Sequence, residues 1–443
     1  MPSTAHESQN VEWKESWRDE YIKWLCGFAN AQGGTLTIGK NDQGQVVGIA
    51  NARQLLEEIP NKVRDLLGIL VDVHSRSEGE LTYLDIVVEP YPYPISYKGQ
   101  YHYRSGSTKQ ELKGAALDKF LLRKQGKHWD GVPVPGADVA SLSAPALELF
   151  RQRARRSGRV DADVLLDSAD ALLENLHLVE GAYLKRAALL LFHPTPERFV
   201  TGAYLKIGRF ATDDDLRYQD EVHGPLLDQI EKGLDLLLTK YLTAGIRYEG
   251  ASRTEEFMFP PEALREALLN ALAHKDYSSG APVQISVYDD RLIFWNDGQL
   301  PDHWTVENLT RKHPSRPFNP DVANTLFRAG YIESWGRGTL KMINECRRHA
   351  LPLPRYTFEA GGCSVEFFQY TAASLQQRGL RTELTQIVLR VQATGMVTNS
   401  AVQELLGVSK STATRYLNEL DRAGYVQKSG TTGVGTGYVL KGS

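Results

Sequence analysis

A carboxylate and an amide stand one helical turn apart in the middle of the chain. Residues 261–273 have the apolar periodicity of a helix that begins at Pro261, and Glu266 and Asn270 lie four positions apart on it. Such a pair suits a specific task, because the amide oxygen can ligate Mg²⁺ while the carboxylate orients and deprotonates a water molecule. The same spacing also fits two solvated residues on a helix surface, and spacing alone favours that interpretation.

Two glycine-containing segments follow this helix. A strand-like run over 291–295 leads into Asn296-Asp297-Gly298, and Gly336-Arg337-Gly338 opens a later helix. Glycines before a helix N-terminus allow backbone N–H groups to face phosphate oxygens. No Gly-x-x-x-x-Gly-Lys-[Ser/Thr] motif occurs, so a P-loop motor, and with it a true helicase, is not expected.

Residues 383–443 show helix, tight turn, helix and hairpin in order. The helices are expected over 401–406 and 410–423, and two strand-like runs surround a Gly- and Thr-rich tip at 430–437. This order resembles a winged helix-turn-helix, whose second helix enters the major groove of DNA. Its exposed side chains, with donors for phosphates and base edges, would be Lys410, Ser411, Thr414, Arg415 and Asn418. A wing that mediates dimerisation or docking is the alternative.

The whole chain indicates a multidomain α+β protein. Its 443 residues are enough for about three domains, and 42% hydrophobic and 24% charged residues are an ordinary globular composition. We expect domains at 1–127, 146–370 and 383–443, joined by linkers at 128–145 and 371–382. The net charge of -3 gives no global attraction to nucleic acid, so any such site must be a local basic patch.

Cysteine usage and the N-terminus predict a cytoplasmic protein. Cys26, Cys346 and Cys363 form no Cys-x-x-Cys pair, which disfavours a zinc ribbon or a disulfide scaffold. The polar N-terminus lacks the apolar stretch of a signal peptide, and no apolar run approaches the ~18 residues that a membrane span needs. The longest candidate, residues 187–192, is expected to be a buried strand.

The middle segment resembles the GHKL ATPases, and more closely the divergent branch found behind Schlafen-type domains. The helix with Glu266, the strand into Asn296-Asp297-Gly298 and the glycine-opened helix occur in the order of that fold. The resemblance implies an α/β sandwich that binds ATP and Mg²⁺, with Glu266 as catalytic base and Asn270 as Mg²⁺ ligand. It also assigns an adenine-facing turn to Asn296, Asp297 and Gly298, and a phosphate loop to Gly336, Arg337 and Gly338.

Two details bear on this assignment. GHKL proteins usually have Asp where Asn296 stands, to accept a hydrogen bond from the adenine amine, although Asn can accept through its amide oxygen. Residues 316–320, Arg-Pro-Phe-Asn-Pro, lie where such folds keep a mobile lid, and they also fit an ordinary proline-rich loop. Nucleotide binding and nucleotide hydrolysis are therefore separate expectations.

Three motifs of the first segment resemble the Alba-like domain of Schlafen proteins. They are Glu12-Trp13-Lys14-Glu15, FANAQGGTLTIG over 28–39 and YHYRSGST over 101–108. The resemblance implies an α/β nucleic-acid-binding module at 1–127. Its candidate phosphate contacts are Lys14, Arg104, Ser105 and Ser107. Each of these also fits a solvated or structural residue.

Some Schlafen proteins are metal-dependent RNases with two acids upstream and a third on a hairpin. Glu7, Glu12 and Asp42 stand in roughly corresponding positions, Asp42 in the turn of a hairpin expected between strands at 35–39 and 46–49. Three carboxylates can hold divalent ions for phosphodiester cleavage. The alternatives are a tail residue, a lysine ion pair and turn chemistry, respectively.

These features together predict a DNA-binding transcriptional regulator that is switched by a nucleotide. We expect a homodimer or higher homo-oligomer whose partner is nucleic acid, DNA rather than RNA, and which has no membrane partner. The first alternative is an ATP-gated, metal-dependent nuclease, for example in defence against phages. The second is an assembly scaffold whose domains bind protein.

Overall fold

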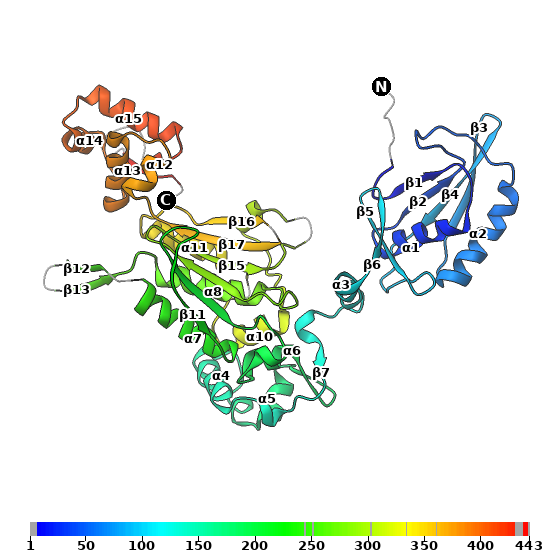
Figure 1. Cartoon of the computed structure of the whole chain (residues 1–443), viewed down its shortest axis with the longest axis horizontal. Coiled ribbons are helices and arrows are strands. Elements are labelled where there is room, and N and C mark those ends of the chain that lie inside the picture. Colours follow the sequence, from blue (N-terminus) through cyan, green and yellow to red (C-terminus); the bar gives the residue numbers. More distant parts are fainter. Residues whose placement is uncertain are drawn as a thin grey trace. The chain divides into compact units, whose positions relative to one another are not determined.

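The computed structural model describes residues 7–242, 245–249, 252–301, 304–333, 335–359, 361–429 and 437–441. The chain divides into two compact units, Met1–His128 and Trp129–Ser443 (Figure 1). Among the residues described, no helix is long and apolar enough to cross a membrane.

The first unit is built on a four-stranded sheet of order β1-β2-β4-β3. β1 pairs with β2 in parallel, and the other pairs are antiparallel. The strands are β1 (Val11–Lys14), β2 (Gly34–Ile38), β3 (Asp72–Glu78) and β4 (Leu81–Val88), with a separate hairpin of β5 (Tyr101–Ser105) and β6 (Thr108–Leu112). The helices are η1 (Asp19–Tyr21), α1 (Ile22–Asn30), α2 (Ala52–Leu67) and α3 (Gly114–Lys124).

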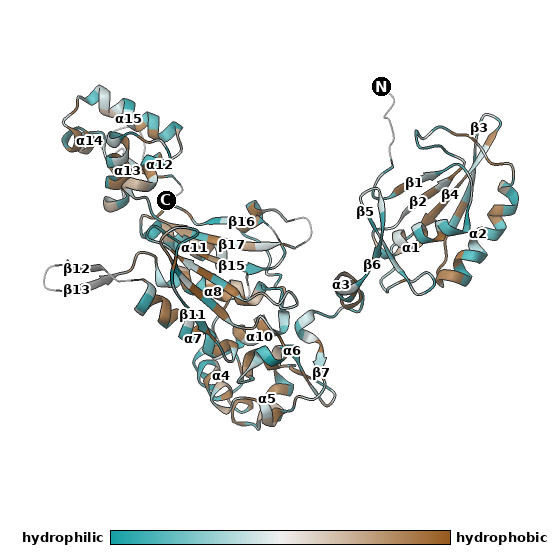
Figure 2. Cartoon of the chain, in the orientation of Figure 1, coloured by the Kyte–Doolittle hydropathy of each residue, from teal (hydrophilic) through white to brown (hydrophobic). Residues whose placement is uncertain are grey.

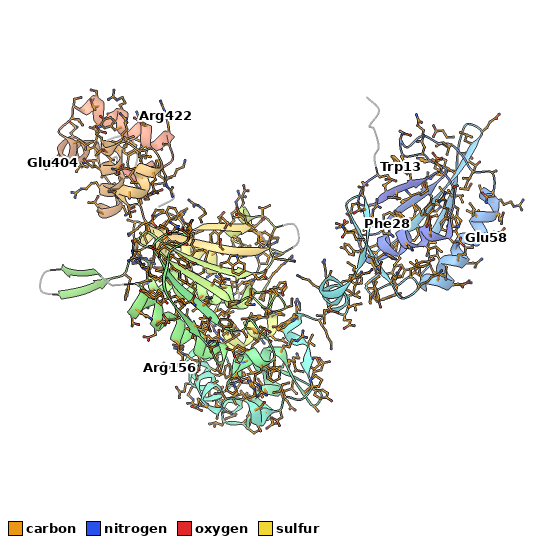
Figure 3. All side chains as sticks on the ribbon, in the orientation of Figure 1. Trp13, Phe28, Glu58, Arg156, Glu404 and Arg422 are labelled. Carbon is orange, nitrogen blue, oxygen red and sulfur yellow. The ribbon has the colours of Figure 1, made fainter. Side chains whose placement is uncertain are left out.

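α1 ends where the chain turns into β2, as the glycine pair predicts. Gly33 has a φ of 76°, and its N–H donates to the carbonyl oxygen of Phe28. A Cβ atom at Gly34 would overlap the Phe28 ring, so glycine is what lets this ring fill the core. Figure 3 labels Phe28 beside α1, and none of its surface is exposed.

The hairpin expected between 35–39 and 46–49 is formed only in part: Lys40 and Val46 make one antiparallel bridge around the turn, but residues 46–49 form no strand. Residues 47 and 48 both donate their N–H groups to the carbonyl oxygen of Gly39, which curls the segment into a turn instead of a strand. β2 therefore pairs with β1 and β4, which come from distant parts of the sequence.

The second unit holds a six-stranded sheet of order β11-β10-β14-β15-β17-β16. β10 and β14 are parallel, and the other neighbours are antiparallel. The strands are β10 (Leu205–Phe210), β11 (Leu216–Val222), β14 (Val283–Val287), β15 (Arg291–Asp297), β16 (Arg355–Glu359) and β17 (Gly362–Phe368). A smaller sheet contains β7 (Pro133–Val134), β9 (Tyr183–Lys185) and β8 (Val179–Glu180) in that order. A separate two-stranded sheet contains β12 (Gly245–Glu249) and β13 (Ser252–Glu256).

Helix α8 (Pro261–His274) packs on β15 in the middle of this sheet, where Figure 2 shows hydrophobic strands. Pro261 stands in its first turn, as predicted, and most of its residues are buried. The other helices are α4 (Ala144–Ser157), α5 (Ala169–Asn175), α6 (Arg186–Phe192), α7 (Leu226–Leu236), α9 (Val306–Leu309), α10 (Pro320–Arg328) and α11 (Gly338–Arg348). Short turns are η2 (Trp129–Gly131), η3 (Val139–Ser141), η4 (Val164–Leu166), η5 (Pro196–Arg198) and the π-helical η6 (Leu237–Tyr241).

The buried strand expected at 187–192 is wrong, because these residues form most of α6. All six of them are buried. A helix that is buried on every side has no polar face, so its sequence lacks the periodicity that would separate it from a buried strand.

The C-terminal part confirms the winged helix-turn-helix order. Helices α12 (Ala372–Gln377), α13 (Thr382–Thr394), α14 (Asn399–Leu406) and α15 (Lys410–Arg422) precede the antiparallel strands β18 (Val426–Ser429) and β19 (Gly437–Leu440). Ser409 caps α15 by accepting a hydrogen bond from the Thr412 N–H. Residues 430–436 of the expected wing tip lie outside the described residues.

Candidate nucleotide site and nucleic-acid surfaces

Glu266 and Asn270 face the interior of the second unit. Glu266 is 7% exposed and Asn270 is half-buried, and both line a pocket against the first turn of α11. The alternative interpretation, in which both residues are solvated on a helix surface, is therefore wrong, because α8 and α11 pack together over this face. Burial raises the pKa of the Glu266 carboxyl, and the nearby cations of Lys341 and Arg265 oppose that shift only in part. A raised carboxyl pKa is what a general base near neutral pH requires.

Gly338 brings the start of α11 directly onto this pair. A Cβ atom at Gly338 would overlap Glu266 Oε1 and would lie 2.9 Å from Asn270 Nδ2. Within the described residues, Asn270 Nδ2 is buried without a hydrogen-bond partner. The fold therefore does not fix this amide, and its oxygen can be turned toward a ligand.

The pocket has a volume of about 150 Å³ and combines apolar with polar walls. Apolar side chains include Phe294, Met342, Tyr356 and Val365. The predicted residues that line it are Glu266, Asn270, Asn296, Gly298, Gly336, Arg337 and Gly338. Sequence reasoning missed further polar lining residues, among them His274, His313, Glu333, Thr339 and Cys363. Only His274 had a local signal, because it lies one turn after Asn270 on the same helix.

The end of β15 presents Asn296 to the pocket, whereas Asp297, the last residue of this strand, does not line it. Asn296 is buried, and its Nδ2 donates to the Asp297 carbonyl oxygen at 3.1 Å. This leaves the amide oxygen as the acceptor that can face a base. Asp297 was expected at the nucleotide, but its carbonyl oxygen instead accepts from the Asp276 N–H at 2.7 Å. Its contribution is to hold the turn against the end of α8.

His313 links two loops that border the pocket. Its Nε2 lies 3.3 Å from Thr339 Oγ1, and its ring meets the Trp304 ring edge-on at 4.9 Å. A Cβ atom at Gly336 would overlap the His313 carbonyl oxygen, so glycine permits this approach. Burial, with a smaller effect of His313, lowers the pKa of His274 to about 4. His274 is therefore a neutral donor or acceptor at physiological pH.

The expected lid at 316–320 borders the pocket through Arg316 and is anchored at its other end. Asn319 is completely buried, and its Nδ2 donates to the carbonyl oxygens of Ala273 at 3.1 Å and Lys275 at 2.7 Å. These carbonyls end α8, the helix that carries Glu266. Any opening of this segment must therefore take place before Asn319.

In the first unit, Glu12 and Arg104 form a buried ion pair. Glu12 Oε2 lies 2.6 Å from Arg104 Nη1, with side chains 4% and 0% exposed. Arg104 also donates to the carbonyl oxygens of Ser8 and Val11. Arg104 is thus not the exposed phosphate contact that the sequence predicted, because its charge is used inside the domain. The predicted Ser105, at the end of β5, and Ser107, in the turn that follows it, are both exposed.

Lys14 binds two of the three carboxylates considered for a nuclease. Its Nζ lies 2.6 Å from Glu12 Oε1 and 3.5 Å from Glu7 Oε1. Burial alone would lower the pKa of Lys14, but Glu12 and Glu7 raise it above its usual value. Asp42 is exposed in the turn at 41–45. Over the described part of the chain, no three His, Cys, Asp or Glu side chains are placed to hold a metal ion.

α15 carries the predicted polar residues on its outer face. Those residues, all exposed, are Lys410, Ser411, Thr414, Arg415 and Asn418. Leu417 and Leu420 are buried on the other side, which fixes the helix rotation. Thr414 Oγ1 accepts from Asn399 Nδ2 at 2.9 Å, so this hydroxyl also joins α14 to α15. Figure 3 labels Arg422 at the end of the same helix.

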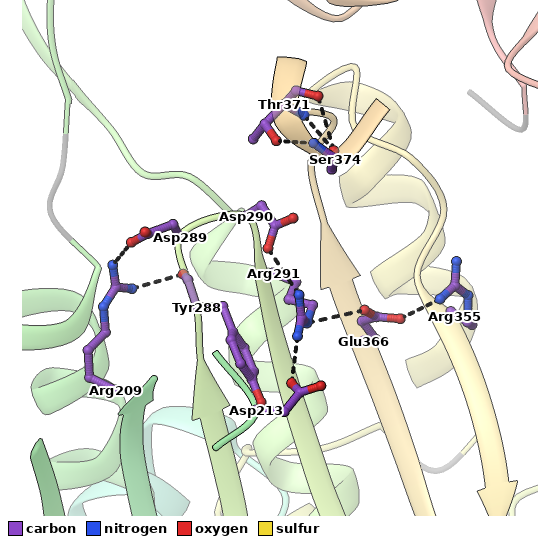
Figure 4. A network of polar contacts seen from close by, with 10 residues as sticks. All are labelled: Arg209, Asp213, Tyr288, Asp289, Asp290, Arg291, Arg355, Glu366, Thr371 and Ser374. Carbon is purple, nitrogen blue, oxygen red and sulfur yellow. Dashed lines mark hydrogen bonds and ion pairs between the residues drawn. The ribbon is translucent and has the colours of Figure 1, made fainter. Parts of the chain in front are cut away.

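A polar network joins the strand ends nearest the winged helix (Figure 4). Arg291 Nη2 lies 2.8 Å from Asp213 Oδ1, and Glu366 bridges Arg291 Nε at 4.0 Å and Arg355 Nη1 at 2.8 Å. Beyond the network, Tyr370 exchanges two backbone hydrogen bonds, of 2.8 and 3.1 Å, with the Gln392 side chain of α13. β15 and β17 thus have pocket residues at one end and this junction at the other.

Comparisons with known proteins match three parts of the chain. Residues 7–113 match the family model "Schlafen, AlbA_2", and residues 280–367 match HATPase_c_4, "Putative ATP-dependent DNA helicase recG C-terminal". Residues 385–434 match "Iron dependent repressor, N-terminal DNA binding domain".

Whole-chain comparisons add little. Among solved structures, the chain is similar to the DIP2311 protein from Corynebacterium diphtheriae, at 18% identity and a TM-score of 0.46, over 98% of this chain and 92% of that one. No curated protein matches the chain. The family matches confirm the three resemblances and their order. The chain therefore combines a Schlafen AlbA_2 domain, an ATPase-like HATPase_c_4 domain and a C-terminal winged-helix DNA-binding domain in one polypeptide.

Proposed function

We propose that this protein is a DNA-binding transcriptional regulator whose affinity for DNA is set by ATP in the pocket beside Glu266. One observation carries the proposal: Gly338, at the opening of α11, packs directly on the Glu266–Asn270 pair. A glycine-opened helix N-terminus offers backbone N–H groups and a positive dipole end to phosphates. A carboxylate and an amide at that place can serve the same phosphates.

Each residue has a definite role in this proposal. Asn270 would hold Mg²⁺ through its amide oxygen, and the ion, when bound, would neutralise phosphate charge. Asn296 would accept a hydrogen bond from the base amine, against the apolar wall of Phe294 and Val365. Glu266 would take a proton from the attacking water, since its raised pKa makes it a stronger base than an exposed carboxylate.

The winged helix would read duplex DNA. Lys410 and Arg415 are exposed on α15 and can reach phosphates or base edges, while Ser411 and Asn418 supply further donors. Helix-turn-helix readers commonly act as dimers on paired half-sites, so we propose a homodimer or higher homo-oligomer. Its mass in solution, measured by light scattering with and without nucleotide, tests this part directly.

The sheet supplies a route from the pocket to the reader. Asn296 and Cys363 stand side by side at the pocket end of β15 and β17, and Arg291 and Glu366 stand at the junction end. A shift of these two strands on nucleotide binding would move the junction that holds Tyr370 against α13. Arg291→Ala should therefore retain nucleotide binding and weaken the effect of nucleotide on DNA affinity.

The first experiment is Mg²⁺-dependent ATP binding and hydrolysis by the wild type and Glu266→Ala, with and without duplex DNA. We expect binding in both proteins, turnover in the wild type alone, and a change of DNA affinity with ATP. Absence of ATP binding by the wild type would overturn the switch. ATP binding without turnover would mean that the pocket senses ATP but does not hydrolyse it.

A metal-dependent nuclease is the weaker proposal. Glu12 is held by Lys14 and Arg104, so it could bind a cation only after both ion pairs were broken. A direct test is cleavage of labelled DNA and RNA in Mg²⁺ or Mn²⁺ by the wild type and Asp42→Ala. Cleavage that Asp42→Ala abolishes would revive this function.

A further inference from the structure

Trp24, near the start of α1, is set between two lysine ammonium groups. The Lys109 Nζ lies 4.8 Å from the centroid of its ring, and the Lys14 Nζ lies 5.7 Å from it. The ring is half-buried, and the hydrophobic core of the unit is assembled without it. A half-buried aromatic side chain outside the core, with cations near its ring, is suited to stacking on a ligand.

Neighbouring aromatic rings hold Trp24 in place. Tyr21 meets Trp24 edge-on at 5.6 Å and 84°, and Trp17 meets Tyr21 at 6.4 Å and 87°. Trp17 and Tyr21 pack against the core, so the series is rooted in the domain. An aromatic ring that is already fixed loses little entropy when a planar group stacks on it.

The surroundings of Trp24 carry positive charge that lacks full compensation. Burial, with the charge of Lys23, lowers the pKa of Lys109, while Glu111 opposes the shift only in part. β5 and the Lys109 stem lie close to α1 at Gly27, where a Cβ atom would make an ordinary contact of 3.7 Å with Lys109 Cγ. The exposed turn with Ser105 and Ser107 immediately precedes Lys109.

The two tyrosines of the YHYRSGST motif pack inside the domain instead of offering a free ring face. Tyr101 and Tyr103 both pack against Phe120 of α3, at ring distances of 6.2 and 6.1 Å. Trp24 differs from them, because its ring contacts are one tyrosine edge, the ammonium group of Lys109 and the ion-paired ammonium group of Lys14. Lysine side chains are flexible and can move from a ring to a phosphate.

We infer that Trp24 is the stacking platform of a binding site for single-stranded nucleic acid, in which Lys109 and Lys23 contact phosphates. An unpaired base has a free face to stack, whereas bases in a duplex already stack on each other. The inference rests on the nucleic-acid-binding role that the Schlafen AlbA_2 match suggests for the first domain, and it names the substrate class of that domain. DNA and RNA single strands share this chemistry, and the experiment separates them.

The test uses the full chain with Lys410→Ala and Arg415→Ala, which removes the proposed duplex reader. Fluorescence anisotropy measures its binding to labelled oligothymidylate and oligouridylate of about 16 nucleotides, and to a duplex of equal length. We expect the single strands to bind better than the duplex. Adding Trp24→Ala should weaken single-strand binding about tenfold, whereas Trp24→Tyr should retain most of it.

Tyr93→Ala is the matched control, because Tyr93 is a 52% exposed aromatic residue of the same unit, beside Tyr91. Lys109→Ala leaves the three aromatic side chains in place, and it should weaken single-strand binding and reduce its salt dependence. It therefore tests the site even if Trp24→Ala fails to fold. Equal single-strand affinity in Trp24→Ala and Tyr93→Ala, or no single-strand binding by the parent, would overturn the inference. Neither result would affect the proposed switch, which is measured as ATP-dependent duplex binding with the winged helix intact.

Discussion

Gly338 packs so closely against Glu266 that a side chain at position 338 would collide with the carboxylate. A Cβ atom at position 338 would overlap Glu266 Oε1, although the two residues belong to different helices and lie far apart in the sequence. The glycine is thus set by packing against a carboxylate as well as by the turn that opens α11. This gives a role in the fold to a position that the sequence assigned to phosphate binding.

Gly338→Ala should lower stability and abolish nucleotide binding, because α11 must move off α8. We expect a loss of about 1–3 kcal/mol, as for other overpacked sites, seen as an earlier urea midpoint. The control is the double variant with Glu266→Ala, which removes the overlapping carboxylate and should recover part of the stability without restoring turnover. If the two losses simply add, the contact is not the cause.

Glu266→Gln should remove turnover and stabilise the protein at alkaline pH. Burial raises the folded pKa of Glu266, so its stabilising contribution is present at low pH and is lost as pH rises through that value. The glutamine variant should melt above the wild type at pH 8 and level with it at low pH. Turnover should fall by about 100-fold or more. Wild-type turnover in this variant would exclude Glu266 as the base.

Much of this site follows from local sequence signals. Proline in the first turn and apolar periodicity place α8 at Pro261–His274, and a glycine-opened helix appears as α11. These features depend on residues close together in the chain, where helix periodicity and capping act. The burial of Glu266 could not be predicted in this way. Glu266 is buried by α11, a helix from another part of the sequence, and the apolar pattern of α8 carries no information about that contact.

Other features depend on contacts between distant segments. Arg104 resembles a phosphate ligand by its motif, and only the approach of Glu12 on β1 turns it into an internal charge. His313 belongs to no recognisable motif, and only its contact with Thr339 places it at the pocket. Trp24 lies on α1, and the cation beside its ring comes from Lys109 on β6. Residue types alone do not reveal such pairings.

Asp130 should make stability fall between acidic and neutral pH. Its Oδ2 accepts from the N–H groups of Asp321 and Val322 at the start of α10, and burial raises its pKa to about 7. Since the unfolded value is about 4, stability is greatest below that pH and is lost as pH rises toward 7. The effect should be on the order of a few kcal/mol.

Asp130→Asn keeps an acceptor for α10 without the charge. It should match the wild type below about pH 4 and exceed it in urea resistance at pH 8, whereas Asp130→Ala should be weaker than Asp130→Asn at both. An asparagine variant that is less stable at pH 8 would mean that the carboxylate is stabilised by the helix N-terminus more than it is penalised by burial.

Glu12→Gln should destabilise the first domain by about 3–5 kcal/mol, because it leaves the buried Arg104 without its counter-ion. Glu7→Gln is the control: Glu7 pairs with the same Lys14 but is 28% exposed, so about 1 kcal/mol or less is expected. Hydrogen exchange of β1 and β5 amides in the full chain measures both. Equal protection in the two variants would contradict a structural role for Glu12.

Lys410→Ala with Arg415→Ala should weaken duplex binding and reduce its salt dependence. Each phosphate contact that is lost should lower the slope of log affinity against log salt by about 0.9, so two contacts predict a change of about 1.8. Arg390→Ala is the matched control, since Arg390 is exposed on α13 and not on α15. A smaller slope change with lost sequence preference would mean that one side chain reads a base edge. An unchanged slope and affinity would remove α15 as the reader and leave duplex binding to another surface.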